Sequence, residues 1–228
     1  MAKNSVADWD TTAANNTDVG GISIAEGCAM ANLNNAMREI MAQVKTLNPV
    51  AGTLTSVGQH TIWVPALAMV AATTSGAASG TAETTTNKVM VKTLDFDASS
   101  EEFAQFMIQM PKSWDEGTLI AQFIWTHGAT TTNFGVAWGF EAVAFANDDA
   151  LDTAWGTEVV TVDTGGTTND VYISPESTAV TVAGTPGAEE LVAFRVTRVV
   201  GNGSDTMAVD AKLIGVKIHY TTNAGNDD

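Results

Sequence analysis

LVAFRVTRVV, residues 191–200, is the segment that most directly indicates the fold of this chain. Large apolar side chains are interleaved there with charged or hydroxyl-bearing ones. The apolar members are Phe194, Val196 and Val199, and the polar members are Arg195, Thr197 and Arg198. Because side chains of a β-strand point alternately to the two faces of a sheet, the pattern predicts a strand with one buried and one solvent-facing side.

Similar runs of strand-forming residues recur through the rest of the chain, separated by turn sequences such as "WDEG", "DTGGTTND" and "GNGSD". The predicted strands are 62–70, 89–96, 102–110, 118–125, 134–145, 158–162, 170–173, 178–182, 191–200 and 206–220, the last with a bend at Gly215. No stretch among them has helix periodicity long enough for a crossover connection, so the pairing must be largely antiparallel. We therefore predict a mainly β fold: an antiparallel two-sheet sandwich, jelly-roll-like, over residues 61–222.

The tract ATTSGAASGTAETTTNK, residues 72–88, interrupts this series. It is low in complexity and consists mostly of Thr, Ser, Gly and Ala. We expect it to be a long exposed loop or an edge segment that wraps a neighbour.

One segment near the start, residues 30–48, has helical rather than strand periodicity. Its apolar residues are spaced 3, 4, 3, 4 and 3 and would form one seam; they are Met30, Leu33, Met37, Ile40, Val44 and Leu47. The flanking positions Asn34, Ala36, Met41 and Gln43 carry no charge. The apolar face is thus broader than the seam of a two-stranded zipper, which favours three or more helices together or docking in a groove. The alternative is a lone helix packed on its own β-domain.

The first 29 residues have too few apolar side chains to make a core of their own. Trp9 is the exception in size, and it should lie against another subunit, stay exposed, or fold back on the chain's own β-domain. We predict an extended attachment arm at 1–29, an amphipathic helix at 30–48, a linker at 49–60, the β-sandwich at 61–222 and a tail at 223–228.

Composition excludes several classes of partner. The 228 residues include 10 Lys+Arg against 26 Asp+Glu, a formal net charge of −16 that disfavours nucleic acid and anionic membrane surfaces. The single Cys28 allows no internal disulfide. The N-terminus has no apolar region typical of a signal peptide, and the apolar run 62–72 is too short to span a bilayer. We expect assembly in a cytoplasm without export.

The sequence predicts neither an enzyme nor a cofactor or metal site. The carboxylates weighed as a catalytic pair mostly lie in turn sequences, where acidic residues are common; they are Asp95, Asp97, Asp115, Glu116, Asp148, Asp149 and Asp152. The acidic turn 147–152 has oxygen donors suited to Ca²⁺ but lacks the spacing of an EF-hand loop, so we leave Ca²⁺ binding there open and favour a solvated turn. The three histidines are not in metal-ligand spacing, and no G-x-S-x-G nucleophile motif is present.

Tryptophans are the candidates for sugar contact, since aromatic faces can stack on sugar rings. Besides Trp9, the chain has five, at positions 63, 114, 125, 138 and 155. Trp125 and Trp138 fall in the middle of predicted strands and are assigned to the core. Trp114 and Trp155 border turns, so we predict them at the surface as possible glycan contacts.

The opening DWDTTAANNTDVGGISIAEGCAMANLNNAMREIMAQVKTL, residues 8–47, resembles the N-terminal attachment segment of many fibre proteins of tailed bacteriophages. In that family a Trp with Thr, Ala and Asn residues leads to an I-x-E-G step and then an N-N-A-(I/M)-R helix. The matching residues are Trp9, Ala13, Ala14, Asn15, Asn16, Gly20, Ile24, Glu26, Gly27, Asn34, Asn35, Ala36, Met37, Arg38 and Glu39. Segments 92–118 and 147–157 also look like a domain of uncharacterised virion proteins of phages that infect Alphaproteobacteria.

The resemblance implies a trimeric structural protein of a tailed-phage virion, a short fibre or fibre adaptor. A head fibre or a capsid decoration protein is one alternative, and a glycan-binding receptor-recognition module is another. The implied partners are further copies of the chain, other virion proteins and a host surface glycan, with no nucleic acid and no membrane insertion. The implied location is the virion, assembled in the host cytoplasm. The residues expected to attach and oligomerise the protein are Trp9, Ile22, Ile24, Met30, Leu33, Met37, Ile40, Val44 and Leu47.

Overall fold

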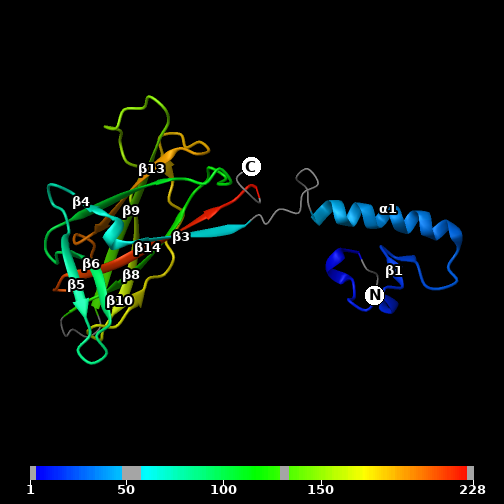
Figure 1. Cartoon of the computed structure of the whole chain (residues 1–228), viewed down its shortest axis with the longest axis horizontal. Helices are drawn as coiled ribbons and strands as arrows, with labels where there is room; N and C mark the ends of the chain where they lie inside the picture. The colour runs from blue at the N-terminus through cyan, green and yellow to red at the C-terminus, as the bar shows by residue number, and fades with distance from the viewer. Residues whose placement is uncertain (1–3, 48–57, 129–133, 225–228) are drawn as a thin grey trace. The chain divides into compact units, whose positions relative to one another are not determined.

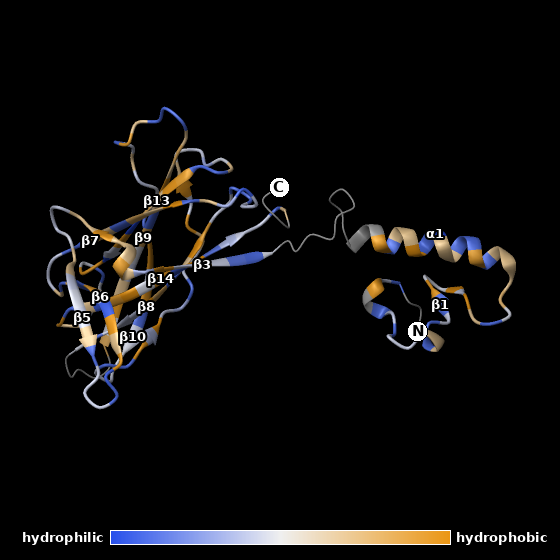
Figure 2. Ribbon diagram, in the orientation of Figure 1, coloured by the Kyte–Doolittle hydropathy of each residue, from blue (hydrophilic) through white to orange (hydrophobic). Residues whose placement is uncertain are grey.

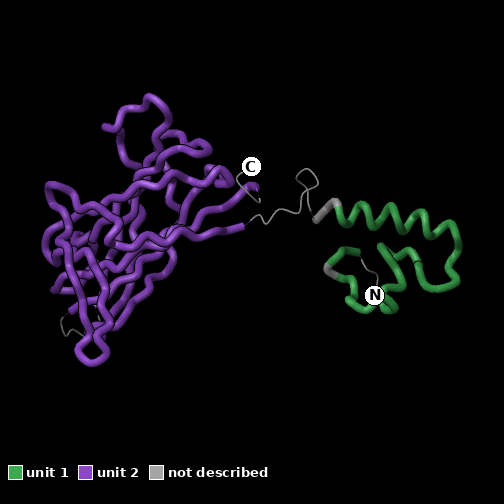
Figure 3. The backbone as a smooth tube through the Cα atoms, viewed as in Figure 1, with its two compact units in different colours: residues 1–56 green, residues 57–228 purple. Residues whose placement is uncertain are grey.

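A computed structural model describes residues 4–47, 58–128 and 134–224. Contacts within the chain divide it into two compact units, residues 1–56 and 57–228 (Figure 3). The predicted linker 49–60 and tail 223–228 fall mainly outside the described residues.

The N-terminal unit consists of one helix and a short arm that packs on it. The arm contains two 3₁₀ turns and a small hairpin, and the helix follows; the elements are η1 Val6–Asp8, η2 Ala13–Asn15, β1 Asp18–Val19, β2 Ile22–Ser23 and α1 Met30–Leu47. Gly20 and Gly21 both have positive φ, 58° and 78°, which the tight turn between β1 and β2 requires. Val19 and Ala36 are buried, so the arm finds part of its cover on its own helix.

The second unit is a sandwich of two sheets, which confirms the predicted fold (Figure 1). One sheet has the order β10-β9-β13-β7-β4, with β12 beside β9; the strands are β4 Val70–Ala71, β7 Phe103–Gln109, β9 Phe134–Phe145, β10 Val159–Gly165, β12 Val182–Ala183 and β13 Leu191–Arg198. The other has the order β11-β8-β14-β6-β5, with β3 also beside β14; the strands are β3 Gln59–Pro65, β5 Ala78–Glu83, β6 Met90–Phe96, β8 Ile120–Thr126, β11 Tyr172–Ile173 and β14 Ala211–Thr221. The turn η3 Ala66–Ala68 connects β3 to β4.

Pairing between these strands is antiparallel except between β12 and β9, as the lack of crossover helices predicts. Strand β14 has an irregularity between Leu213 and Gly215, at the bend that the sequence indicates. The low-complexity tract 72–88 contains β5, which pairs with β6 at the edge of the sandwich's own sheet, so residues 78–83 are an edge strand, while the wrapping of a neighbour stays a prediction.

The core lies between the sheets and is rich in aromatic rings. Trp125 and Trp138 are both fully buried, as predicted, and Phe123 stacks on Trp138 with ring centroids 5.5 Å apart. Figure 2 shows hydrophobic residues concentrated in the strands of the sandwich and recurring along α1. Close aromatic packing of this kind gives the sandwich a densely packed core of its own.

Arg198 lies inside this core, contrary to the sequence prediction that placed it on the polar face of its strand. Its side chain has no exposed surface and pairs with Asp205, with Nη2 and Oδ1 2.8 Å apart. The guanidinium also donates to the carbonyls of Phe96, Met207 and Val209 at 3.3, 2.5 and 2.7 Å. Strict alternation from Phe194 and Val196 points Arg198 inward, and these acceptors make the burial possible.

Candidate functional site

The most distinctive surface of the N-terminal unit is a row of large apolar side chains along α1. Five are exposed to solvent: Met30 (85%), Leu33 (53%), Met37 (58%), Met41 (71%) and Val44 (47%). Their spacing of 3, 4, 4 and 3 residues places them on one side of the helix, and we call this row the α1 stripe. Contiguous exposed apolar surface of this kind marks an interaction site.

An adjacent side of α1 faces the arm. Trp9, Asn16, Asp18, Val19, Ile24 and Ile40 line a hollow of about 210 Å³ between the arm and the helix. The indole Nε1 of Trp9 donates to Oε1 of Gln43 at 3.2 Å, and Nε2 of Gln43 donates to Oε1 of Glu39 at 3.1 Å. Trp9 therefore lies on its own helix, a position that none of the three sequence-based alternatives named.

The residues predicted to form one attachment and oligomerisation surface thus fall into two groups. Met30, Leu33, Met37 and Val44 belong to the α1 stripe, together with Met41, which the heptad spacing placed beside the seam. The remaining members do not join the stripe: Trp9, Ile24 and Ile40 line the arm-side hollow, Ile22 is half-buried in β2, and the side chain of Leu47 lies outside the described residues. The four-residue spacing from Met37 to Met41 is the sequence feature that could have placed Met41 in the exposed row.

In the sandwich, the expected surface position of Trp114 is wrong. Its side chain is fully buried because the segment pairs back onto the end of the chain: Trp114 bridges Thr222, and the Asp115 N–H donates to the Thr221 carbonyl at 3.0 Å. A nearby turn sequence does not reveal this long-range pairing.

Trp155 is half-buried and one face of it is already occupied. The Arg195 guanidinium carbon lies 5.0 Å from the Trp155 ring centroid and 4.9 Å from that of Phe103. Nε of Arg195 also pairs with Oε2 of Glu141 at 2.5 Å. Sugar stacking on this ring remains a prediction, with less free aromatic surface than the sequence suggested.

Glu158 adjoins this cluster, and its carboxylate occupies the space above Gly139. Burial raises the pKa of Glu158, and the negative charges of Glu141 and Glu101 raise it further, while Arg195 acts in the opposite direction. The cluster therefore holds one carboxylate paired with arginine and one that retains its proton more readily than usual.

Three of the acidic residues considered for a catalytic pair form hydrogen bonds or ion pairs within their own turns and strands. Asp97 accepts hydrogen bonds from the Ser99 hydroxyl and from the N–H groups of Ser99 and Ser100, which lower its pKa. Asp95 pairs with Lys212 across β6 and β14. In the turn 147–152, Asp149 accepts from the Ala146 N–H at 2.8 Å. Within the part of the chain that the structure describes, no three His, Cys, Asp or Glu side chains form a group able to hold a metal ion.

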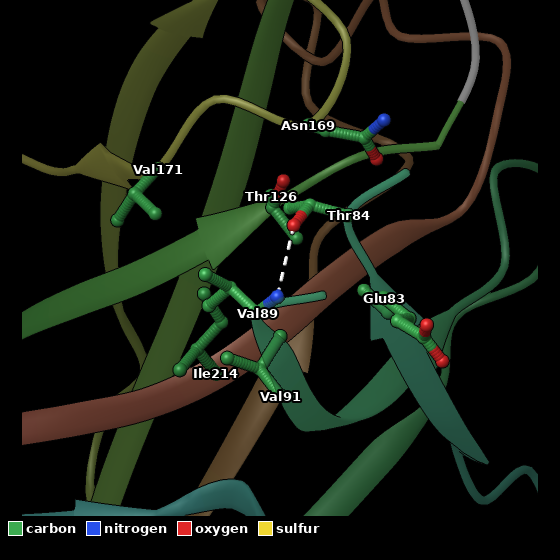
Figure 4. Close-up of a pocket in the computed structure, with 9 residues that line it drawn as sticks. Glu83, Thr84, Val89, Val91, Thr126, Asn169, Val171 and Ile214 are labelled. Atoms are coloured by element: carbon green, nitrogen blue, oxygen red, sulfur yellow. Dashed lines mark hydrogen bonds between the residues drawn. The ribbon is translucent and has the colours of Figure 1, made fainter. Parts of the chain in front are cut away.

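A small pocket lies on the outer face of the β11-β8-β14-β6-β5 sheet, beside the turn between β5 and β6 (Figure 4). It is lined by Ala82, Glu83, Thr84, Val89, Val91, Thr126, Asn169, Val171 and Ile214, and its volume is about 60 Å³. The Val89 N–H donates to the Thr84 hydroxyl at 2.9 Å, and Glu83 turns its carboxylate away from the apolar side chains. Ligand pockets usually have about 300–1,000 Å³, so this pocket does not fit a sugar ring.

None of the helices in the described residues is both long and apolar enough to cross a bilayer.

Comparison with known proteins finds no matching family model and no matching curated protein. Among solved structures, the family 11 carbohydrate-binding module from Clostridium thermocellum is similar with a TM-score of 0.40 and 9% identity, over 75% of this chain and 99% of that one. The CBM22-2 xylan-binding domain from Paenibacillus barcinonensis is similar with a TM-score of 0.40 and 12% identity, over 68% and 92%. A protein of unknown function from Shewanella oneidensis MR-1 has a TM-score of 0.33 and 9% identity, over 82% and 96%.

Proposed function

We propose that the chain is a self-associating structural protein of a tailed-phage virion, a short fibre or fibre adaptor. In this proposal the N-terminal unit joins the copies and attaches them, and the sandwich is the contact domain. The observation that carries the proposal is the α1 stripe, five large apolar side chains left open on a helix whose adjacent side is covered by its own arm. The resemblance of residues 8–47 to phage attachment segments supplies the biological setting.

The stripe is large enough to sustain self-association. A fully buried large apolar side chain contributes about 1.5–3 kcal/mol, so covering the exposed fractions of the five stripe residues contributes about 5–9 kcal/mol per helix. Two helices that cover each other's stripes would gain about 10–18 kcal/mol, against an estimated association cost of 4–15 kcal/mol or more. Stripe burial can therefore sustain self-association, and the homotrimer is proposed from the resemblance to phage fibres rather than from this sum.

The test is the oligomeric state of the full chain, measured by sedimentation equilibrium. Met37→Lys places a charge in the centre of the stripe and should shift the protein toward monomer, because the ammonium would be desolvated in the interface. Asn35→Lys is the matched control, since it adds the same charge to an exposed position of α1 outside the stripe. A wild-type monomer, or equal behaviour of the two variants, would refute association through the stripe.

The place in the particle is tested separately. Antibody labelling of intact particles viewed by electron microscopy should mark the tail for a fibre or fibre adaptor. Labelling of the head surface would instead support the alternative head fibre or decoration protein.

A second candidate function is glycan binding by the sandwich. The observation that favours it is Trp63, which is 46% exposed and is the most exposed tryptophan of the described sandwich. A tryptophan with one open side on a sheet offers a stacking surface for a sugar ring. Binding of soluble oligosaccharides to the full chain, followed by titration calorimetry, tests this function.

A further inference from the structure

Trp63 lies in a row of side chains that crosses three strands on the outer face of one sheet. In β14, Lys217 pairs with Trp63 of β3 on one side and with Gln122 of β8 on the other. Directly paired residues of neighbouring strands point to the same face. The adjacent residues Val64 and Val216 belong to the core, so the Trp63, Lys217 and Gln122 side chains point away from it.

Gly215 allows the Trp63 indole to lean along this face. The indole Cζ2 is 2.7 Å from the place that a Cβ at Gly215 would occupy, and the Val64 carbonyl oxygen is 2.6 Å from it. Any larger residue would displace the ring. The residue is 46% exposed, so part of the indole remains open to solvent beside β14.

Hydrogen-bonding groups continue the row beyond the ring. Nζ of Lys217 donates to Oε1 of Gln122 at 2.9 Å, and Nε2 of Gln122 donates to the Ser174 carbonyl at 2.9 Å. Among the ion pairs of the described residues, none includes Lys217, so this half-buried ammonium is not neutralised by a carboxylate there. Neighbouring strands are about 4.8 Å apart, which places these groups within one sugar ring's width of the indole.

We infer that Trp63, Lys217 and Gln122 form a carbohydrate-binding shelf, and we call these three residues the Trp63 shelf. One pyranose ring of a polysaccharide stacks on the indole, and its ring substituents accept hydrogen bonds from the Lys217 ammonium. The inference rests on the second candidate function, glycan binding, and names the site and ligand class for it.

Charge and shape favour this occupant over a protein surface. The shelf combines one aromatic ring with a cation that lacks a carboxylate partner among the described ion pairs, and acceptor oxygens on a sugar complement that cation. Hydroxyl and carboxylate substituents share this chemistry, so neutral and uronate polymers are separate arms of one test.

The experiment titrates the full chain with cellohexaose, xylohexaose and a galacturonate oligosaccharide by calorimetry. Trp63→Ala should weaken binding of the recognised oligosaccharide about tenfold or more, the ratio that corresponds to about 1.4 kcal/mol. Trp63→Phe should retain part of the affinity. If the ligand is acidic, Lys217→Met should weaken binding of the uronate more than binding of a neutral sugar. If the ligand is neutral, the variant should weaken the binding of both similarly. Trp155→Ala is the matched control.

The outcomes separate the site from the function. Binding by wild type that is unchanged in Trp63→Ala would overturn the shelf and leave glycan binding in place; selective loss in Trp155→Ala would assign it to the Arg195 cluster instead. No binding of any probe by wild type would overturn both. Loss of self-association in Trp63→Ala, without sugar binding by wild type, would show that the shelf contacts protein. Unchanged near-ultraviolet circular dichroism would establish that each variant is folded.

Discussion

Replacing Arg198 by Met should destabilise the sandwich severely while keeping the volume of the side chain similar. The substitution leaves the Asp205 carboxylate, which is 2% exposed, without its cation, and it leaves the carbonyls of Phe96, Met207 and Val209 without the guanidinium donors. Breaking a buried ion pair from one side costs about 3–5 kcal/mol. For a unit of this size, each kcal/mol lowers the melting temperature by about 2–4 °C, so we expect a drop of roughly 6–20 °C.

The assay is thermal unfolding followed by near-ultraviolet circular dichroism. Five of the six tryptophans lie in the sandwich sequence, so this signal reports mainly on that unit. Arg195→Met is the matched control: Arg195 also pairs with a glutamate, but its side chain is 26% exposed and lies on the outer face. Its loss should be smaller, because water can replace part of the interaction.

Removing both charges tests the physical reason directly. Arg198→Met combined with Asp205→Leu should recover part of the lost stability, since no unpaired charge then remains in the core. If Arg198→Met alone loses no more stability than Arg195→Met, the reasoning that the buried Arg198–Asp205 pair stabilises the sandwich is refuted.

Two further changes test the Glu158 cluster and the arm. Because burial raises the pKa of Glu158, folding favours its protonated form, and ionisation costs stability as pH rises through the raised value. Glu158→Gln should therefore be more stable than wild type at neutral pH and lose this advantage near pH 4. The midpoints of urea unfolding at the two pH values measure the difference in stability. A stability advantage of the variant that grows in acid would contradict the prediction. Trp9→Ala removes a half-buried ring and its hydrogen bond to Gln43, so the amide protons of α1 should exchange faster, by a factor of about 5–30 for a local loss of about 1–2 kcal/mol. Because the α1 stripe itself is intact, self-association should persist but weaken as the helix loosens, and unchanged exchange would mean that the arm does not stabilise α1.

Local sequence patterns predicted the sandwich because strand alternation and turn residues can be recognised within short segments. Alternation and turn chemistry identified β13 within residues 191–200 and β9 at residues 134–145, and the bend at Gly215 followed from a glycine inside a strand pattern. Strand β5 was harder to identify, because its Ala, Ser, Gly and Thr residues have little apolar alternation and it is held mainly by pairing with β6.

The site residues were harder to predict because their exposure depends on distant segments. Trp114 is buried by its bridge to Thr222, more than a hundred positions later in the chain. Trp63 falls in a predicted strand that does not assign it to either face, and its pairing with Lys217 and the space above Gly215 that its indole fills place it on the outer face. Neither long-range contact can be deduced from a short segment of neighbouring residues.

The two sides of α1 have different consequences for assembly. The arm covers the side that carries Ile40 and Gln43, so a single copy already satisfies the polar groups and part of the apolar surface there. It leaves the α1 stripe open, and methionine supplies three of its five side chains. Methionine adapts its shape to a partner because it is unbranched and has several rotatable bonds, so the stripe can pack against identical helices without strict knob-and-hole geometry. An arm that orders the helix before association lowers the entropy cost of forming the oligomer, because the helix need not fold at that moment. In the proposed assembly, the arm therefore contributes to self-association indirectly, by holding α1 in its helical form.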